Sequence, residues 1–143
     1  MENRYLFRGK RADNGEWVHG YFMMSEPSQF TKITRPVIVG SQSGIAEYID
    51  PATIGQCTGI RDRHGRLIFE GDLLRWSEDG DSEVGKVLWE TGGWAIFFGK
   101  HINCMESELL DADTGERIDW EIIGNIHDNP ELMREGKKRC KSN

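Results

Sequence analysis

The residues whose types and spacing come closest to a catalytic site lie in one short stretch: Asp62, His64, Glu70 and Asp72. Glu70 and Asp72, with Asp62 or His64 nearby in the sequence, could act as general acid and base in a hydrolysis. A structural turn at Glu70, Gly71 and Asp72 is the favoured interpretation, because the Asp72 carboxylate can accept backbone N–H bonds there. The sequence also has no phosphate-binding glycine-rich loop, nucleophile elbow or HExxH motif. We therefore expect no catalytic residue, and a hydrolase is the least favoured function.

Metal-binding residue types are too scattered to predict a metal site. The four histidines lie far apart in the sequence, and His101 with Cys104 is the only close histidine–cysteine pair. A structural zinc site usually needs four such ligands. The three cysteines also show no close pairing that would predict a disulfide framework. We expect neither a metal ion nor another cofactor.

Basic residues gather on two segments that we expect to be hairpins: Arg8, Lys10 and Arg11 on the first, and Arg61, Arg63 and Arg66 on the second. If the two hairpins share a face, they could form a nucleic-acid-binding patch with nearby aromatic side chains. The net charge of −6 opposes broad nucleic-acid binding. Most of the five tryptophans are expected to fill the core instead.

Glycine-containing turns divide the chain into short strands rich in aromatic and β-branched residues. The turn Asn14-Gly15 predicts a hairpin between 4–10 and 16–24, since Asn-Gly readily adopts positive φ angles. Further hairpins are predicted across the turns at 63–65 and 91–93. The polar stretch 77–82 is expected to be a loop tip. Asn129 followed by Pro130 predicts the start of a short helix.

These elements predict a mostly-β fold built from several short antiparallel hairpins. The layout of residues 68–126 indicates a small SH3-like barrel, which would remove exposed strand edges. We expect one β domain over residues 1–133, with a short helical turn at its C-terminal end. Residues 134–143 carry five basic residues and one acidic residue, and we expect a disordered basic tail there.

The compartment is predicted from what the sequence lacks. No apolar stretch of signal-peptide type follows the polar start of the chain, and no apolar run approaches the ~18 residues of a membrane span. We expect a cytoplasmic protein that does not bind membranes.

Several segments, in this order along the chain, resemble the YopX family: Phe7-Arg8-Gly9, Gly15-Glu16-Trp17-Val18, Gly20, Thr53-Ile54-Gly55-Gln56, Thr58-Gly59, Asp62, Gly65, Ile68, Glu70-Gly71-Asp72, Ile123-Gly124-Asn125-Ile126 and Asn129-Pro130-Glu131-Leu132. One departure is Cys57, where the family would have an aromatic residue. The resemblance implies a β-rich fold and a phage or prophage setting. It implies no reaction, so no catalytic residue can be carried over.

We therefore expect a phage- or prophage-type accessory protein that acts by binding, in the cytoplasm of a bacterial host. Protein interaction or self-assembly is the favoured mode, with a homo-oligomer as the expected state, because short strands can pair through their edges. The alternative is a nucleic-acid-binding module that uses the basic hairpins and the small barrel.

Overall fold

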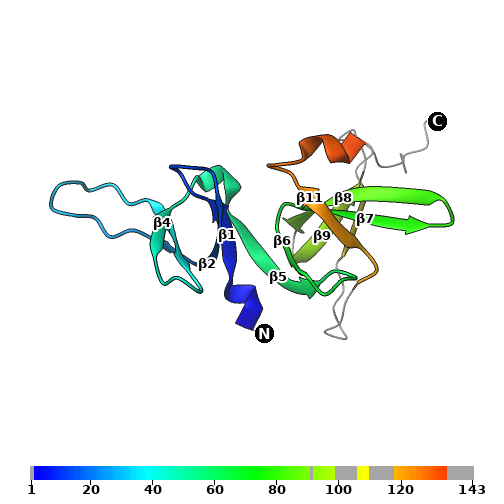
Figure 1. Ribbon diagram of the computed structural model, residues 1–143, viewed down its shortest axis with the longest axis horizontal. Coiled ribbons are helices and arrows are strands. Elements are labelled where there is room, and N and C mark those ends of the chain that lie inside the picture. The colour runs from blue at the N-terminus through cyan, green and yellow to red at the C-terminus, as the bar shows by residue number, and fades with distance from the viewer. Residues whose placement is uncertain (1, 91, 99–105, 110–117, 135–143) are drawn as a thin grey trace. The chain divides into compact units, whose positions relative to one another are not determined.

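Hairpin turns organise the chain into strands in the computed structural model, which describes residues 2–90, 92–98, 106–109 and 118–134 (Figure 1). The prediction of a mostly-β fold is confirmed, since two antiparallel sheets hold most of these residues. The chain divides into two compact units, Met1–Cys57 and Thr58–Asn143, called here the N-terminal and C-terminal units. The single domain over 1–133 stays a prediction. Apart from Arg134, the expected basic tail lies outside the described residues.

The N-terminal unit contains short strands and single helical turns. Its elements are η1 (Glu2–Tyr5), β1 (Phe7–Lys10), β2 (Trp17–Met24), β3 (Pro36–Gly40), β4 (Ala46–Tyr48), η2 (Pro51–Thr53) and the start of β5 (Gly55–Arg61). The strands pair in the order β4-β3-β2-β1-β5, and β6 follows β5 in the same sheet. The hairpin predicted at Asn14-Gly15 is confirmed, with Lys10 opposite Trp17.

The chain after β4 returns to the end of β1 and pairs with it, which closes the N-terminal unit around a narrow interior. The N–H of Ala12 donates to the carbonyl of Tyr48 over 2.9 Å, and the N–H of Asp50 donates to the carbonyl of Lys10 over 2.8 Å. Ile38 and Ile49 are buried inside. A Cβ atom added to Gly9 would collide with the side chain of Ile49, so glycine is required where the wall closes.

The C-terminal unit contains the rest of β5 and a second sheet. Its elements are β6 (Leu67–Phe69), β7 (Asp72–Glu78), β8 (Asp81–Glu90), β9 (Gly93–Phe98), β10 (Glu106–Leu109), β11 (Glu121–Asn125) and η4 (Pro130–Arg134). The five-stranded sheet has the order β10-β9-β8-β7-β11. The hairpins predicted around 63–65 and 91–93 are confirmed by the β5–β6 and β8–β9 neighbours. The expected helical turn is the 3-10 helix η4.

The expected loop at 77–82 is wrong, because β7 and β8 continue as a ladder to Glu78 opposite Asp81. Only Asp79 and Gly80 form the turn, with φ angles of 50° and 84°. Two successive positive φ angles match the right-handed twist of a hairpin. The polar residues on either side are therefore strand residues whose side chains face solvent.

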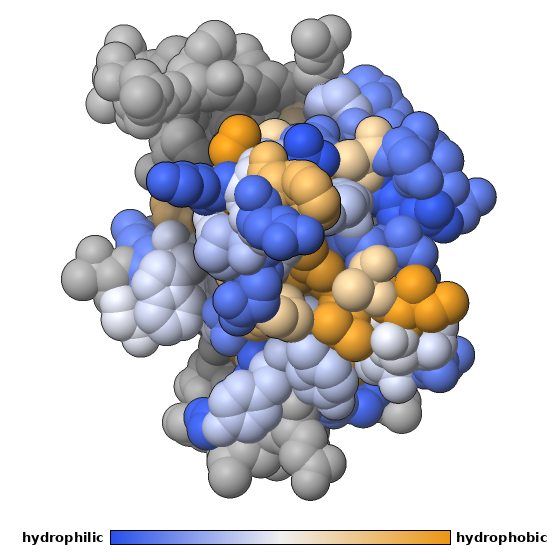
Figure 2. Space-filling view, turned by 90° about the vertical axis from the view of Figure 1, so that its left-hand side faces the viewer, coloured by the Kyte–Doolittle hydropathy of each residue, from blue (hydrophilic) through white to orange (hydrophobic). Residues whose placement is uncertain are grey.

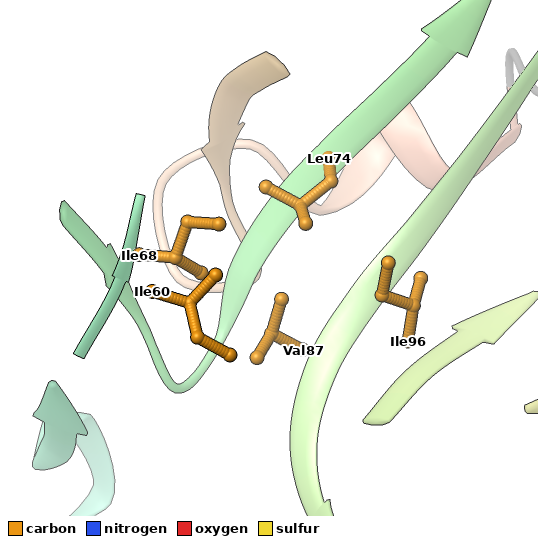
Figure 3. Close-up of a cluster of buried hydrophobic side chains, with 5 residues drawn as sticks. All are labelled: Ile60, Ile68, Leu74, Val87 and Ile96. Carbon is orange, nitrogen blue, oxygen red and sulfur yellow. The ribbon is translucent and has the colours of Figure 1, made fainter. Parts of the chain in front are cut away.

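Five branched side chains form the core of the C-terminal unit: Ile60, Ile68, Leu74, Val87 and Ile96 (Figure 3). They come from β5, β6, β7, β8 and β9, so the cluster joins both sheets within this unit. Trp94 and Trp120 are partly buried and pack against the cluster, whereas Trp89 is 57% exposed, so only part of the expected tryptophan core is seen. Burial of such side chains is the main source of stability in a domain of this size.

Closure of the predicted SH3-like barrel is not seen among the described strands. Strands β10 and β11 are the two edges of the five-stranded sheet. The chain before β11 is tied to the β5–β6 hairpin, since Ile118 N–H donates to the Arg61 carbonyl over 3.1 Å and Arg63 N–H donates to the Trp120 carbonyl over 2.9 Å. The barrel over 68–126 stays a prediction. No described helix is long and apolar enough to cross a membrane.

Ile68→Ala should lower the free energy of unfolding by about 2–5 kcal/mol, because the side chain is fully buried and its removal leaves a cavity. The measurement is urea unfolding of the full chain. Ile45→Ala is the matched control, since Ile45 is 58% exposed, and it should leave the stability unchanged within about 0.5 kcal/mol. Equal losses for the two variants would contradict the assigned core.

Candidate functional site

The Glu70-Gly71-Asp72 turn is a fastening point of the C-terminal unit. Gly71 has a φ of 88°, a conformation that favours glycine. The Asp72 carboxylate is buried and accepts the N–H of Phe69 over 2.7 Å. The backbone of Gly71 donates to Val87 and accepts from Ile126, over 2.7 and 2.9 Å. The turn thereby attaches β7 to β8 and to the chain that follows β11.

Asp62 is the second buried carboxylate, and it also serves backbone donors. It accepts the N–H groups of His64, Arg66 and Ile122 over 2.9, 2.8 and 3.1 Å. The Arg66 side chain adds an ion pair of 3.1 Å. Burial alone would raise the pKa of Asp62, but the three N–H donors and the Arg66 charge together lower it. An ionised carboxylate therefore holds the β5–β6 turn against β11.

The four hydrolase candidates fall at opposite ends of β6. Asp62 and His64 lie in the turn before Leu67, whereas Glu70 and Asp72 lie after Phe69. The His64 ring contacts Glu121 over 3.2 Å rather than either buried aspartate. Both aspartates accept backbone N–H groups, the role that a turn requires. The two aspartates therefore stabilise turns, and the residues at the two ends of β6 form no acid–base pair with each other.

Glu121 shares its carboxylate between two partners. Arg75 donates to one oxygen over 2.6 Å, and the His64 ring lies 3.2 Å from the other. The hydrogen bonds from Arg75 and then from His64 lower the pKa of Glu121.

Among the described residues no group of three or more His, Cys, Asp or Glu could hold a metal ion, and His101 and Cys104 lie outside the described residues.

The basic residues of the first predicted hairpin have partners within the N-terminal unit. Arg8 is buried, with its guanidinium 4.8 Å from the centre of the Trp17 ring, and the Lys10 ammonium lies 5.4 Å from the same centre. Arg11 forms an ion pair with Asp13 over 2.7 Å. Burial and the nearby charge of Arg8 lower the pKa of His19. The positive charges are thus partly used in holding β1 against β2.

The basic residues of the second predicted hairpin are exposed in the C-terminal unit. Arg61 donates to the carbonyl of Gly65 over 2.8 Å, and Arg66 donates to the carbonyl of Ile122 over 2.7 Å. These contacts support the turn. Since the two basic groups belong to different units, the structure defines no common face for them.

Exposed apolar side chains are the feature that the sequence did not reveal. Ten large ones are exposed among the described residues: Tyr5, Tyr21, Phe22, Met23, Met24, Phe30, Ile33, Ile45, Tyr48 and Trp89. Nine of them belong to the N-terminal unit, and only Trp89 belongs to the C-terminal unit. Exposed apolar side chains that are contiguous on a surface mark a binding region, whereas singly scattered ones are normal.

The sheet of the N-terminal unit has an apolar outer face. Val37 pairs with Met23 on one side and with Tyr48 on the other, and paired residues of an antiparallel sheet share a face. Tyr21 belongs to the same face because it lies two residues before Met23. A groove of about 220 Å³ opens on this face between its side chains. Its lining residues are Met23, Ser25, Val37, Ala46 and Tyr48.

A long hairpin-like arm, residues 25–35, joins β2 to β3 and projects from the strands (Figure 1, light blue). Its base is fastened where Ser25 N–H donates to the Arg35 carbonyl over 2.7 Å. Its tip is shaped by the Ser28 hydroxyl oxygen, which accepts two backbone N–H groups over 3.1 Å. Phe30 is 89% exposed at this tip. In the view toward the arm, hydrophobic side chains gather in a patch bordered by hydrophilic ones (Figure 2).

Asp62→Asn should lower the free energy of unfolding at neutral pH by about 1–3 kcal/mol, because an amide nitrogen cannot accept the N–H groups that the carboxylate serves. The wild-type advantage should shrink as the pH falls below 3.8, the ordinary value for aspartate, since the lowered pKa means that stability is lost on protonation. Urea unfolding of both chains between neutral pH and about pH 3 measures this difference in the free energy of unfolding. Asp119→Asn, at an exposed position, is the control. A constant difference at all pH values would contradict an ionised Asp62.

Gly71→Val should destabilise the C-terminal unit by at least 1–2 kcal/mol, roughly the strain of a positive φ in a side-chain-bearing residue. A Cβ atom there would lie 3.5 Å from Ile126, an ordinary contact, so the cost is conformational. Gly71→Asn should cost less, because asparagine tolerates this conformation. Thermal unfolding distinguishes them. A Gly71→Val chain with wild-type stability but lost partner binding would show that the turn is functional instead.

Comparison with known proteins places the chain in a family. A family model, that of the YopX protein, matches residues 6–134. The crystal structure of protein EF1440 from Enterococcus faecalis is similar, with 22% identity, a TM-score of 0.51, and coverage of 89% of this chain and 96% of that one. That likeness shows the fold alone. None of the curated proteins compared matches the chain. Because the family model spans most of the sequence, the chain belongs to the YopX family.

Proposed function

We propose that this protein is a phage- or prophage-type accessory protein that acts by binding a protein chain in the cytoplasm of a bacterial host. The observation that carries the proposal is the concentration of exposed apolar side chains in the N-terminal unit. Isolated apolar residues on a surface need no explanation, whereas neighbouring ones with a groove between them indicate an interface. No reaction enters the proposal.

The chemistry of the outer face suits a protein partner. Tyr21, Met23 and Tyr48 are each about half exposed and share this face. Tyrosine and methionine are enriched at protein interfaces, and methionine adapts its shape to a partner. The Arg35 guanidinium lies 5.2 Å from the centre of the Tyr48 ring and adds a charged border. An apolar centre with a polar rim is the usual anatomy of such a contact.

Nucleic-acid binding is the second candidate, supported by the exposed side chains of Arg61 and Arg63. Its weakness is that other basic side chains serve the fold, as Arg8 does on Trp17 and Arg66 does on Asp62. A gel shift at two salt concentrations tests it, because phosphate contacts weaken as salt rises. Retardation of DNA or RNA at low salt that is lost in an Arg61→Ala, Arg63→Ala chain would favour this candidate over the first.

Met23→Asp should reduce partner recovery about tenfold, because it places a charge at the centre of an apolar interface. The measurement is affinity capture of the tagged full chain from prophage-induced cells, with quantification of the proteins that co-purify. Trp89→Asp is the matched control, since Trp89 is an exposed apolar residue of the C-terminal unit, and it should leave recovery unchanged. Equal recovery with both variants, each with wild-type thermal unfolding, would contradict the proposed surface.

A further inference from the structure

We propose that the groove on the outer face receives Phe30 from the arm of a second copy of this chain. The inference rests on the proposed function, in that it uses the same surface, and it adds the identity of the partner. The occupant is an aromatic ring carried by the protein itself.

The groove has the size and lining that an aromatic ring requires. Its volume is about 220 Å³, and an apolar cavity of about 150 Å³ is enough to hold benzene. Buried Val37 forms its floor and Ala46 leaves space, while Met23 and Tyr48 are partly exposed. Contact between methionine sulfur and an aromatic ring is favourable in itself. A phenylalanine ring would therefore displace water from a groove whose mostly apolar lining has few groups that can form hydrogen bonds with water.

The arm does not place Phe30 in the groove of its own chain. Ser25 belongs both to the groove lining and to the fastened base of the arm. Phe30 lies five residues further along, which is about 17 Å of extended chain at ~3.3 Å per residue. Its exposed fraction of 89% shows that its ring is packed against nothing in its own chain. The ring and the groove are thus both open within one molecule.

A second copy supplies what each molecule lacks. In a closed symmetric assembly every arm and every groove is used once, and a two-fold dimer is the smallest such assembly. Five side chains of this surface, Tyr21, Met23, Phe30, Ile33 and Tyr48, expose roughly 600 Å² per copy, at about 200 Å² for a fully exposed large side chain. A standard interface buries about 800 Å² per partner, a little over half of it apolar. The apolar area is sufficient for a stable contact.

Charge does not oppose the contact between copies. The whole chain has a net charge of −6, which would keep copies apart in general. The groove-lining residues are all uncharged. The arm carries charges of both signs: Glu26 is acidic, and Lys32 and Arg35 are basic. Two arms and two grooves can therefore approach without repulsion between like-charged surfaces.

The first test measures the molar mass of the purified full chain across concentrations, by light scattering and sedimentation. We expect a multiple of 16.4 kDa, from two copies upward. Phe30→Asp should weaken the association about a hundredfold, as for a central aromatic anchor. Ile33→Asp should also weaken it, whereas Ile45→Asp should not. Ile45 is a matched control because it is 58% exposed, against 67% for Ile33, and lies on neither the arm nor the groove.

A second experiment locates the contact. Benzoylphenylalanine at position 30 is photolysed in a mixture of ¹⁴N and ¹⁵N chains, and the cross-linked peptides are identified by mass spectrometry. Mixed-isotope cross-links to Met23, Val37 or Tyr48 are expected. A strictly monomeric mass, an unchanged Phe30→Asp assembly, or cross-links only to other segments would each overturn the inference. If the chain is monomeric while Met23→Asp still reduces capture of another protein, the proposed function stands and this inference alone fails.

Discussion

The interior of the N-terminal unit is too narrow to bury all of its large apolar side chains. Where β1 meets the chain after β4, only glycine fits at position 9, and a Cβ atom on Gly20 would collide with the Val39 carbonyl. Ile38 and Ile49 fill the space that remains. Since side chains alternate between the faces of a strand, the tight inner face forces Tyr21 and Met23 to the outside. The exposed apolar surface is therefore a consequence of how this unit closes.

The C-terminal unit solves the same problem differently. Its apolar side chains meet in one cluster around Ile68 and Leu74, and its buried polar groups hold turns. Asp62 and Asp72 lie at the two ends of β6, and each accepts backbone N–H groups that would otherwise be buried without partners. With both aspartates occupied by the backbone, and Trp89 the single large apolar side chain exposed among its described residues, this unit has the features of a scaffold. The contrast between the units locates the proposed interaction in the first.

Much of the fold follows from local chemistry, and so the sequence predicts it. Asn14-Gly15 and the turn at Gly65 have strong conformational preferences that act over a few residues. The turn at Asp79-Gly80 was missed because the ends of β7 and β8 on either side of it are polar and resemble a loop in the sequence. The family resemblance covered nearly the same residues as the match at 6–134. These successes concern turns and order along the chain, which need no knowledge of packing.

The candidate site depends on contacts between distant residues, which the sequence does not display. Nothing in the alternation of β2 indicates which of its two faces will close around Ile49. The partners of Arg8 and Asp62 likewise come from other strands, so a basic patch and a catalytic carboxylate were both reasonable readings of the sequence. The arm and its exposed Phe30 become visible only once the base of the arm is seen to be fastened.

The most direct measurement is hydroxyl-radical footprinting of the full chain, dilute and isolated in one sample and in its bound state in cell extract in the other. If the outer face is the interface, Tyr21, Met23, Phe30 and Tyr48 should lose reactivity in the bound state. Trp89, as exposed as Tyr48 but in the C-terminal unit, should keep its reactivity. Equal reactivity of Met23 and Tyr48 in both states would contradict the account, because the apolar face would then stay in contact with water.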